Sequence, residues 1–287
     1  GPAAAVDRKA PDQAIASVKG GHRMVVPYYP DEPWEVAHRQ VRDGKLRVIL
    51  QSPWDPERFA RFKYGFELGV DPEQRGPLSA NERIAYEIGE RLSLPVRPIQ
   101  FYNFHGMRGH LAWAISNTAK PWNQLDWMIR RQPQRFVRQP DILARMLVYD
   151  IFIYNHDRHE GNILVSARSH AGAHDVYLID HDLALFGQYG KWKTHRWWHS
   201  AWDNPAIFIR TPDVRGAVAR FEQLEPTVAA IEAIPGTDLA AMVDGIVDLG
   251  EGYLSHFEAH TVKQMLARRQ EKLRGMLERW CLSEALF

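Results

Sequence analysis

The feature that most constrains the fold is a dense polar loop between two apolar segments. Residues 141–155, DILARMLVYDIFIYN, are apolar nearly all round and predict a buried helix of about four turns. The loop HDRHEGN follows at 156–162, and NILVSA then predicts a short strand. A second strand, DVYLID, ends at Asp180. So many charged and hydrogen-bonding side chains beside an apolar core indicate a functional site.

Three of these polar residues have the chemistry of a phosphate-transfer site. Asp157 and Asn162 have the spacing D-x-x-x-x-N, and Asp180 follows across a short hairpin. In phosphoryl transfer from Mg-ATP, one carboxylate orients the nucleophile and accepts its proton, while an amide oxygen and a second carboxylate hold Mg²⁺. Magnesium uses one or two carboxylates plus phosphate oxygens, so this number of ligands is sufficient. We therefore expect ATP and Mg²⁺ as cofactors.

The N-terminal half has the pattern of a small lobe in which strands surround one helix. A hairpin centred on Asp43-Gly44 and a third strand over 58–66 come first. The segment 78–96 then predicts an amphipathic helix, and 96–115 predicts a second hairpin. Three strands, a helix and two further strands are the order of a small α+β lobe.

Two charged residues of this lobe match what an ATP site needs. Lys63 lies in the third strand, and Glu82 lies on the helix that follows. Lysine suits phosphate oxygens because it is a compact point charge, and protein kinases position such a lysine with a helix glutamate. Ser79 and Glu82 also have the S-x-x-E spacing of a capping box, so Glu82 has a second predicted role at the start of the helix.

The C-terminal half is predicted to be mostly helical. Apart from 141–155, helices are expected over 215–233, 237–249 and 253–282. The chain is therefore divided into an N-terminal lobe over 21–116 and a C-terminal lobe over 117–287. Residues 1–20 are small and polar, and we expect them to be disordered or derived from a tag.

The motifs named above resemble those of HipA-like kinases, a branch of the protein-kinase-like superfamily related to the phosphatidylinositol 3- and 4-kinases. The matching segments are FKYGF, NERIAYEIGERLSLPV, FIYNHDRHEGNILV and VYLIDHDLALF. In that family a strand lysine, a helix NE, an N-x-D-R/A-H-x-x-N loop and an ID-x-x-x-A acid recur in this order. The resemblance covers about residues 35–187. It implies an α+β, two-lobed protein-kinase-like fold with a β-rich N-lobe and a mostly helical C-lobe.

The resemblance also implies roles for the site residues. Lys63 would contact the ATP phosphates, and Glu82 would hold Lys63 in place. Asp157 would be the catalytic base. Asn162 and Asp180 would bind Mg²⁺. The expected activity is that of a HipA-like Ser/Thr protein kinase, which transfers the γ-phosphate of ATP to a hydroxyl group.

Other positions are assigned less completely by the resemblance. His159 would pack the loop or face the phosphates. The adenine would lie in the cleft with its edge on backbone groups of LAWAI (111–115), a segment that includes Trp113. Asp182 stands in IDHD where protein kinases have D-F-G, so its role as a metal ligand is open. No G-x-G-x-x-G loop covers the phosphates, as is often the case in this branch.

Several alternatives remain open at this point. The acceptor could be a lipid or small-molecule hydroxyl instead of a protein. A flipped nucleotide would allow AMP transfer, since the same residues would hold the metal. A pseudokinase would bind nucleotide without turnover, although it would have no need of a base and two metal ligands. The HD pairs at 156–157 and 181–182 suggest an HD-type metal phosphohydrolase, but both pairs border strands instead of lying on helices.

Two further sets of residues have more than one interpretation. The histidines at 156, 159, 174 and 181 suggest zinc, but none has the i, i+4 helical spacing and no cysteine joins them. Arg158 is expected to order the loop through a salt bridge. The Trp-rich segment 191–202 could form a substrate-facing lip, stack nucleobases or pack under the helical lobe.

Composition limits the class of partner. There are 36 Lys and Arg and 35 Asp and Glu, and the net charge of +1 argues against a dedicated nucleic-acid binder. The single cysteine, Cys281, suits a reducing compartment, and no apolar run approaches the roughly 20 residues that span a bilayer. We therefore expect a cytoplasmic protein whose partners are ATP, a hydroxyl acceptor and, from the resemblance alone, a protein regulator.

Overall fold

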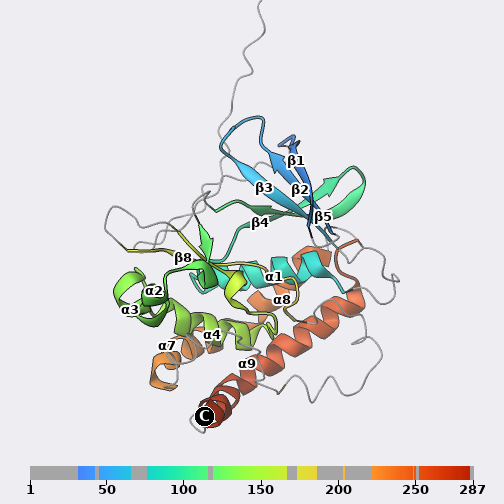
Figure 1. Ribbon diagram of the computed structural model, residues 1–287. Helices are drawn as coiled ribbons and strands as arrows, with labels where there is room; N and C mark the ends of the chain where they lie inside the picture. The colour runs from blue at the N-terminus through green and yellow to red at the C-terminus, as the bar shows by residue number, and fades with distance from the viewer. Residues whose placement is uncertain are drawn as a thin grey trace, which may run out of the picture.

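The protein has a β-rich part above a mostly helical part, as a ribbon view of the computed structural model shows (Figure 1). The structure describes residues 32–42, 45–65, 76–115, 119–166, 173–185, 203, 221–247, 249 and 252–284. This arrangement confirms the predicted α+β, two-lobed organisation. The lobe boundaries at 21–116 and 117–287 stay predictions.

The N-terminal lobe is a five-stranded antiparallel sheet in the order β1-β2-β3-β5-β4. Its strands are β1 Glu35–Arg42, β2 Lys45–Gln51, β3 Phe59–Tyr64, β4 Ile99–Phe104 and β5 Met107–Trp113. The two predicted hairpins and the third strand are confirmed, although the turn at Asp43-Gly44 lies outside the described residues. In the register of β3 and β5, Lys63 pairs with His110 and Phe62 with Leu111. Because side chains alternate along a strand, Lys63 and Phe62 point to opposite faces of the sheet.

Helix α1, Leu78–Arg91, crosses under the sheet and buries Ile84, Ala85 and Ile88. The predicted capping box is wrong. The helix begins at Leu78 after Pro77, with no side-chain cap, and the Ser79 hydroxyl lies 2.7 Å from Nδ1 of His110 instead. Ser79 is already inside the first turn, where its side chain faces the sheet and cannot fold back on the helix start. Glu82 is therefore available for the site.

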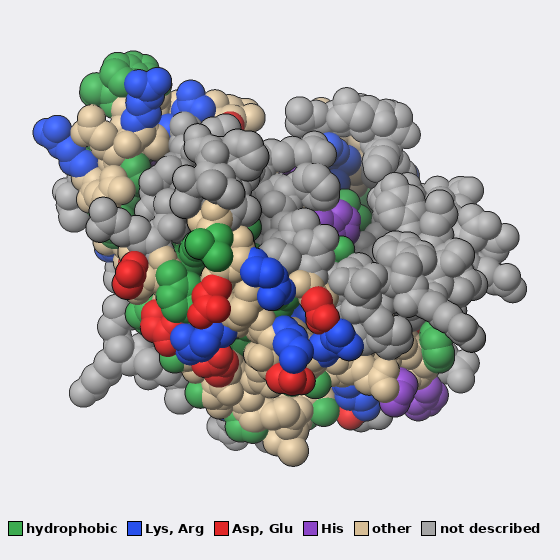
Figure 2. Space-filling view, turned by 90° about the horizontal axis from the view of Figure 1, so that it is seen from below, with side chains coloured by type: hydrophobic (Ala, Val, Ile, Leu, Met, Phe, Trp, Pro, Cys, Tyr) green, Lys and Arg blue, Asp and Glu red, His purple; other side chains and the backbone are tan. Residues whose placement is uncertain are grey.

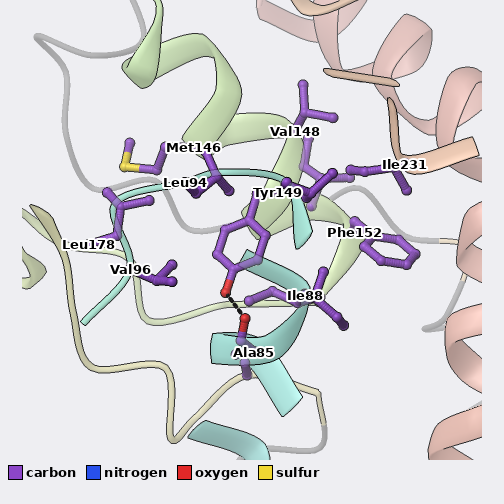
Figure 3. Close-up of a cluster of buried hydrophobic side chains, with 14 of the residues drawn as sticks. Ala85, Ile88, Leu94, Val96, Met146, Val148, Tyr149, Phe152, Leu178 and Ile231 are labelled. Carbon is purple, nitrogen blue, oxygen red and sulfur yellow. Dashed lines mark hydrogen bonds between the residues drawn. The ribbon is translucent and has the colours of Figure 1, made fainter. Parts of the chain in front are cut away.

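The C-terminal lobe is built around α4, Ile142–Phe152, in which every residue except Arg145 is buried. It packs against α7 (Phe221–Glu232) and α9 (His256–Glu284), and α9 also packs against α8 (Gly236–Val247). Tyr149 of α4 donates a hydrogen bond of 2.6 Å to the Ala85 carbonyl of α1, in the middle of the apolar core (Figure 3). Burial raises the pKa of the Tyr149 hydroxyl, which keeps it a donor. The two lobes thus share one core at this point.

Short elements complete the lobe. They are β6 Lys120–Pro121, the 3₁₀ turn η2 Trp122–Gln124, α2 Trp127–Arg131, α3 Pro133–Phe136, the 3₁₀ turn η3 Glu160–Asn162, β7 Ile163–Val165 and β8 Val176–Leu178. Strands β6, β7 and β8 form a small antiparallel sheet. The predicted helices after 215 are confirmed over their described residues, and the Trp-rich segment 191–202 lies outside them. No helix among the described residues has the length and apolarity to cross a membrane.

A glycine substitution tests the close approach of β3 to β5. An added Cβ at Gly109 would fall well inside contact distance of the Lys63 carbonyl oxygen and 2.7 Å from Cζ of Phe62. We expect Gly109→Ala to lower the free energy of unfolding by roughly 1–3 kcal/mol, because β3 must shift. Gly245→Ala in α8 is the matched control, since its Cβ would have no neighbour within 4 Å. It should raise stability by about 0.5–1 kcal/mol in urea unfolding. Equal midpoints for the two variants would contradict the predicted clash.

Candidate active site

The centre of the site is a lysine surrounded by three carboxylates from distant parts of the chain. Nζ of Lys63 on β3 contacts Oδ1 of Asp180, and it lies 2.8 Å from Oδ2 of Asp182 and 3.7 Å from Oε2 of Glu82. Glu82 comes from α1, and the two aspartates follow β8. The structure therefore brings together Lys63, Glu82 and Asp180, as expected for a strand lysine and a helix glutamate, and adds Asp182.

Three carboxylates lie close together in this cluster. Glu82, Asp180 and Asp182 offer carboxylate oxygens that all lie within 4.8 Å of one another, and besides Lys63 the Arg97 guanidinium interacts electrostatically with Asp180 and Glu82. Burial alone would lower the pKa of Lys63, but the three carboxylates raise it well above its usual value, so the lysine stays charged. Burial raises the pKa of Asp182 to about 6 against the opposing effect of Lys63, with Asp180 adding to the rise. Three hard oxygen ligands this close together fit a divalent cation such as Mg²⁺.

The segment 180–182 is bound to α1 by two hydrogen bonds. The backbone N–H of His181 donates to Oε2 of Glu82 at 2.7 Å, and the Asn81 side chain donates to the Asp182 carbonyl at 2.9 Å. Asp180 itself has φ of +63°, a left-handed conformation that aspartate adopts more readily than most residues. This backbone turn lets Asp180 and Asp182 contact Lys63 while the N–H of His181 bonds to Glu82. The sequence analysis assigned no role to Asn81, although it is the first residue of the NE pair.

The loop with Asp157 and Asn162 is fixed by its own backbone bonds. The Asp157 N–H donates to the Asn155 side chain at 3.2 Å, and the Asn162 amide donates to the Asp157 carbonyl at 3.1 Å. The Asn162 carbonyl in turn accepts from the Ile179 N–H at 3.2 Å, next to Asp180. No described side chain forms a hydrogen bond or ion pair with the Asp157 carboxylate. The loop is ordered while its carboxylate stays available.

Arg158 is the buried centre of this loop. It is fully buried and forms a two-point ion pair with Asp150 of α4, at 2.8 and 3.1 Å. Its remaining N–H groups donate to the carbonyls of Asn162 and Ile179, at 2.6 and 3.0 Å, and reach the His181 ring. The expected salt-bridge role of Arg158 agrees with this geometry. The sequence analysis did not identify Asp150 as this partner, because the residues around an acid in an apolar helix do not indicate which base it pairs with.

The side chains of Trp113 and His159, both predicted to lie at the nucleotide, have contacts within the fold. Trp113 pairs with Ala60 across the strands and packs edge-on against Trp34. Both rings belong to the hydrophobic cluster on the face of the sheet opposite Lys63. Its side chain therefore cannot line the cleft that Lys63 faces, and only its backbone could meet an adenine. His159 caps η3 by accepting a hydrogen bond of 3.0 Å from the Gly161 N–H. Of its two predicted roles, this contact matches loop packing.

The histidines do not form a metal site among the described residues. The one group of three potential ligands found there, Glu82, Asp180 and Asp182, contains no histidine. His181 lies 2.8 Å from Arg158, and Nδ1 of His174 lies 2.7 Å from the Ser166 carbonyl. Neither the zinc interpretation nor the HD-type phosphohydrolase is supported by this geometry.

Because His110 is buried, we predict that the protein loses stability in acid. Burial, and then the charge of Lys63, lowers the pKa of His110 to about 3 from 6.5, while Glu82 acts in the opposite direction. Below pH 6.5 the unfolded chain binds a proton that the folded protein does not, so stability falls as the pH decreases. The loss between pH 6.5 and 5 should be about 2 kcal/mol. His110→Gln keeps a partner for Ser79 and should remove this loss, as measured by urea unfolding at both pH values. An unchanged pH dependence in the variant would contradict the assignment.

Comparisons with solved structures identify proteins of similar fold. No family model and no curated protein matches the sequence. Among solved structures, the Helicobacter pylori proinflammatory kinase CtkA matches with a TM-score of 0.53 and 12% identity, over 86% of this chain and 97% of CtkA. A complex of HipA, HipB and operator DNA from Shewanella oneidensis MR-1 matches with a TM-score of 0.42 and 11% identity, over 88% of this chain and 67% of that chain. The kinase-like fold expected from the sequence is therefore confirmed by the similarity to CtkA.

Proposed function

We propose that this protein is an ATP-dependent phosphotransferase that transfers the γ-phosphate of Mg-ATP to the hydroxyl of a protein serine or threonine. The observation that carries the proposal is the meeting of Lys63, Glu82 and Asp180, which come from β3, α1 and the end of β8. In a kinase-like fold these positions supply the phosphate-binding lysine, its helix partner and the metal-binding acid.

Each residue has a separate task in this proposal. Lys63 neutralises charge on the phosphates, and Glu82 keeps Lys63 at the floor of the site. Asn162 and Asp180 would hold Mg²⁺, which when bound would neutralise charge on the phosphates. The carboxylate oxygens of Asp182, Asp180 and Glu82 all lie within 4.8 Å of one another. This group of hard oxygen ligands supports the assignment of a divalent cation at Asp180.

The transfer step needs one base. The acceptor oxygen attacks the γ-phosphorus while the bond from that phosphorus to the bridging oxygen of ADP breaks. Asp157 takes the proton of the acceptor hydroxyl, and ADP leaves with the bonding electrons. Because its loop is held at Asn155 and Asn162, the Asp157 carboxylate is positioned without being used by the fold.

Labelled ATP tests the proposal. The purified protein is incubated with Mg²⁺ and with γ- or α-labelled ATP, in parallel with Asp180→Asn. Transfer of γ-label to the protein or to an added serine peptide, lost in the variant, is the expected result. Transfer of α-label would indicate AMP transfer instead. ATP binding without transfer to protein, peptide, lipid or small-molecule hydroxyls would favour a pseudokinase and overturn the proposal.

A further inference from the structure

A basic surface of the C-terminal lobe is not used by the proposed chemistry. Residues 119–145 contain six Lys and Arg and two Asp, a net charge of +4, whereas the whole protein carries +1. Figure 2 shows basic side chains gathered beside hydrophobic ones at the edge where α2 and α3 lie. Over the underside formed by α7 and α9, opposite charges are interspersed, as in the pairs of Arg274 with Glu225 and Glu232. On this face, basic side chains gather at α2 and α3, whereas those over α7 and α9 are interspersed with acidic ones.

The α2–α3 basic surface is defined here as Trp127, Met128, Arg130, Arg131, Arg135 and Arg138. Trp127 and Met128 are 57% and 46% exposed. The guanidinium of Arg131 lies over the Trp127 ring at 5.6 Å, and neither Arg131 nor Arg135 forms an ion pair with a described residue. Arg130 and Arg138, in contrast, are paired with Glu160 and Asp175. A large exposed aromatic ring beside two arginines that have no acidic partner among the described residues is typical of a recognition surface.

This surface adjoins the loop that carries Asp157 and Asn162. Turn η2, which leads into α2, packs against η3 of that loop. Arg130 of α2 lies 4.0 Å from Glu160 of η3. A chain bound along α2 and α3 would thus pass beside the proposed catalytic base.

A pocket continues the surface beyond α3. Its walls include the buried His174, whose Nδ1 lies 2.7 Å from the Ser166 carbonyl. The apolar part of the walls would take a side chain of a bound chain. The apolar walls are formed by Pro95, Val137, Ile142 and Val176.

We propose that the α2–α3 basic surface and this pocket bind an acidic segment of the protein acceptor, with its carboxylates on Arg131 and Arg135 and an apolar side chain in the pocket. Two arginines without acidic partners are too few for a nucleic-acid backbone, for which some 6–10 phosphate contacts are usual. The five residues of α2 are too short for a membrane-surface helix. That the bound segment belongs to the phosphate acceptor rests on the proposed function. The acidic-segment binding site itself is inferred from the geometry of the surface and the pocket.

Binding is measured first without ATP, so that it does not depend on catalysis. Two labelled peptides are compared by fluorescence anisotropy, one with Glu, Asp and Leu around a serine and one with Lys in place of the acids. We expect the acidic peptide to bind more tightly, and Arg131→Glu with Arg135→Glu to weaken it on the order of tenfold. The matched control reverses two exposed basic residues elsewhere, Arg39→Glu with Lys272→Glu, and should change binding by less than about twofold. Trp127→Ala should weaken binding without changing the net charge.

Other outcomes separate the two proposals. Equal binding of both peptides, equal losses in the variant and its control, or displacement of the acidic peptide by phosphatidylserine vesicles or single-stranded DNA would overturn the docking site. If the acidic peptide binds as expected but γ-label is never transferred, the docking site stands and the proposed kinase activity fails. If transfer occurs and KM for the acidic peptide is unchanged in the Arg131, Arg135 variant, the docking site fails alone.

Discussion

Asp157→Asn is expected to lower the rate of γ-phosphate transfer by about 10²–10⁴-fold while the protein stays as stable as the wild type. The rate falls because an amide cannot accept the proton of the acceptor hydroxyl. Stability is kept because no described side chain forms a hydrogen bond or ion pair with the Asp157 carboxylate, and the loop is held through the backbone N–H and carbonyl of this residue. Initial rates with Mg-ATP and a serine peptide, together with a urea unfolding curve, measure the two effects separately.

The matched control for this variant lies in the same loop. Glu160→Gln removes a carboxylate of similar exposure three residues later, and it leaves the Asp157 carboxylate unchanged. Its transfer rate should stay within about threefold of the wild type, since Glu160 is paired only at 4.0 Å with Arg130. A similar loss of rate in both variants would mean that the charge of the loop, and not a base at Asp157, determines activity.

The elements of the fold were predictable because their signals are local. The strand pattern around Lys63 predicted β3, and the two hairpin patterns predicted β1 with β2 and β4 with β5, within a few residues. The apolar helix at 141–155 appears as α4, Ile142–Phe152, and the order of elements predicted the two lobes. The pairing of Lys63 with Glu82 followed from residue types placed on neighbouring elements of a recognisable fold.

What could not be predicted depends on register and on contacts between distant residues. The face on which Trp113 lies is set by the pairing of Lys63 with His110, and a shift of one residue would reverse it. The capping box failed for a similar reason: Ser79 satisfies its hydroxyl on β5 instead of at the helix start. Asp150 gave no signal because its partner Arg158 comes from the following loop, and the sequence does not show that both are buried.

Replacement of Arg158 should cause the largest loss of stability among single substitutions at the site. In Arg158→Met the Asp150 carboxylate would remain buried with only the Asn155 amide as a described partner. The Asn162 and Ile179 carbonyls would each lose the bond from Arg158, and Asn162 would keep the one from the Ile179 N–H. Removing one partner of a buried ion pair costs about 3–5 kcal/mol, since the remaining charge is left uncompensated. The corresponding decrease of the melting temperature is on the order of 10 °C for a protein of this size.

A double-mutant cycle with Asp150→Asn identifies the cause of that loss. The single Asp150→Asn variant should lose less, because Arg158 keeps its two carbonyl acceptors and His181, and the double variant should lose less than the sum of the two singles. Arg269→Met provides a comparison, as Arg269 is also fully buried and donates to the carbonyls of Ile151 and Phe152. Additive losses at Asp150 and Arg158 would show that the two side chains act independently. A coupling of 1 kcal/mol or more, on the order expected for contacting charges, would establish this buried pair as the link that fixes the catalytic loop to α4 and to the strand before Asp180.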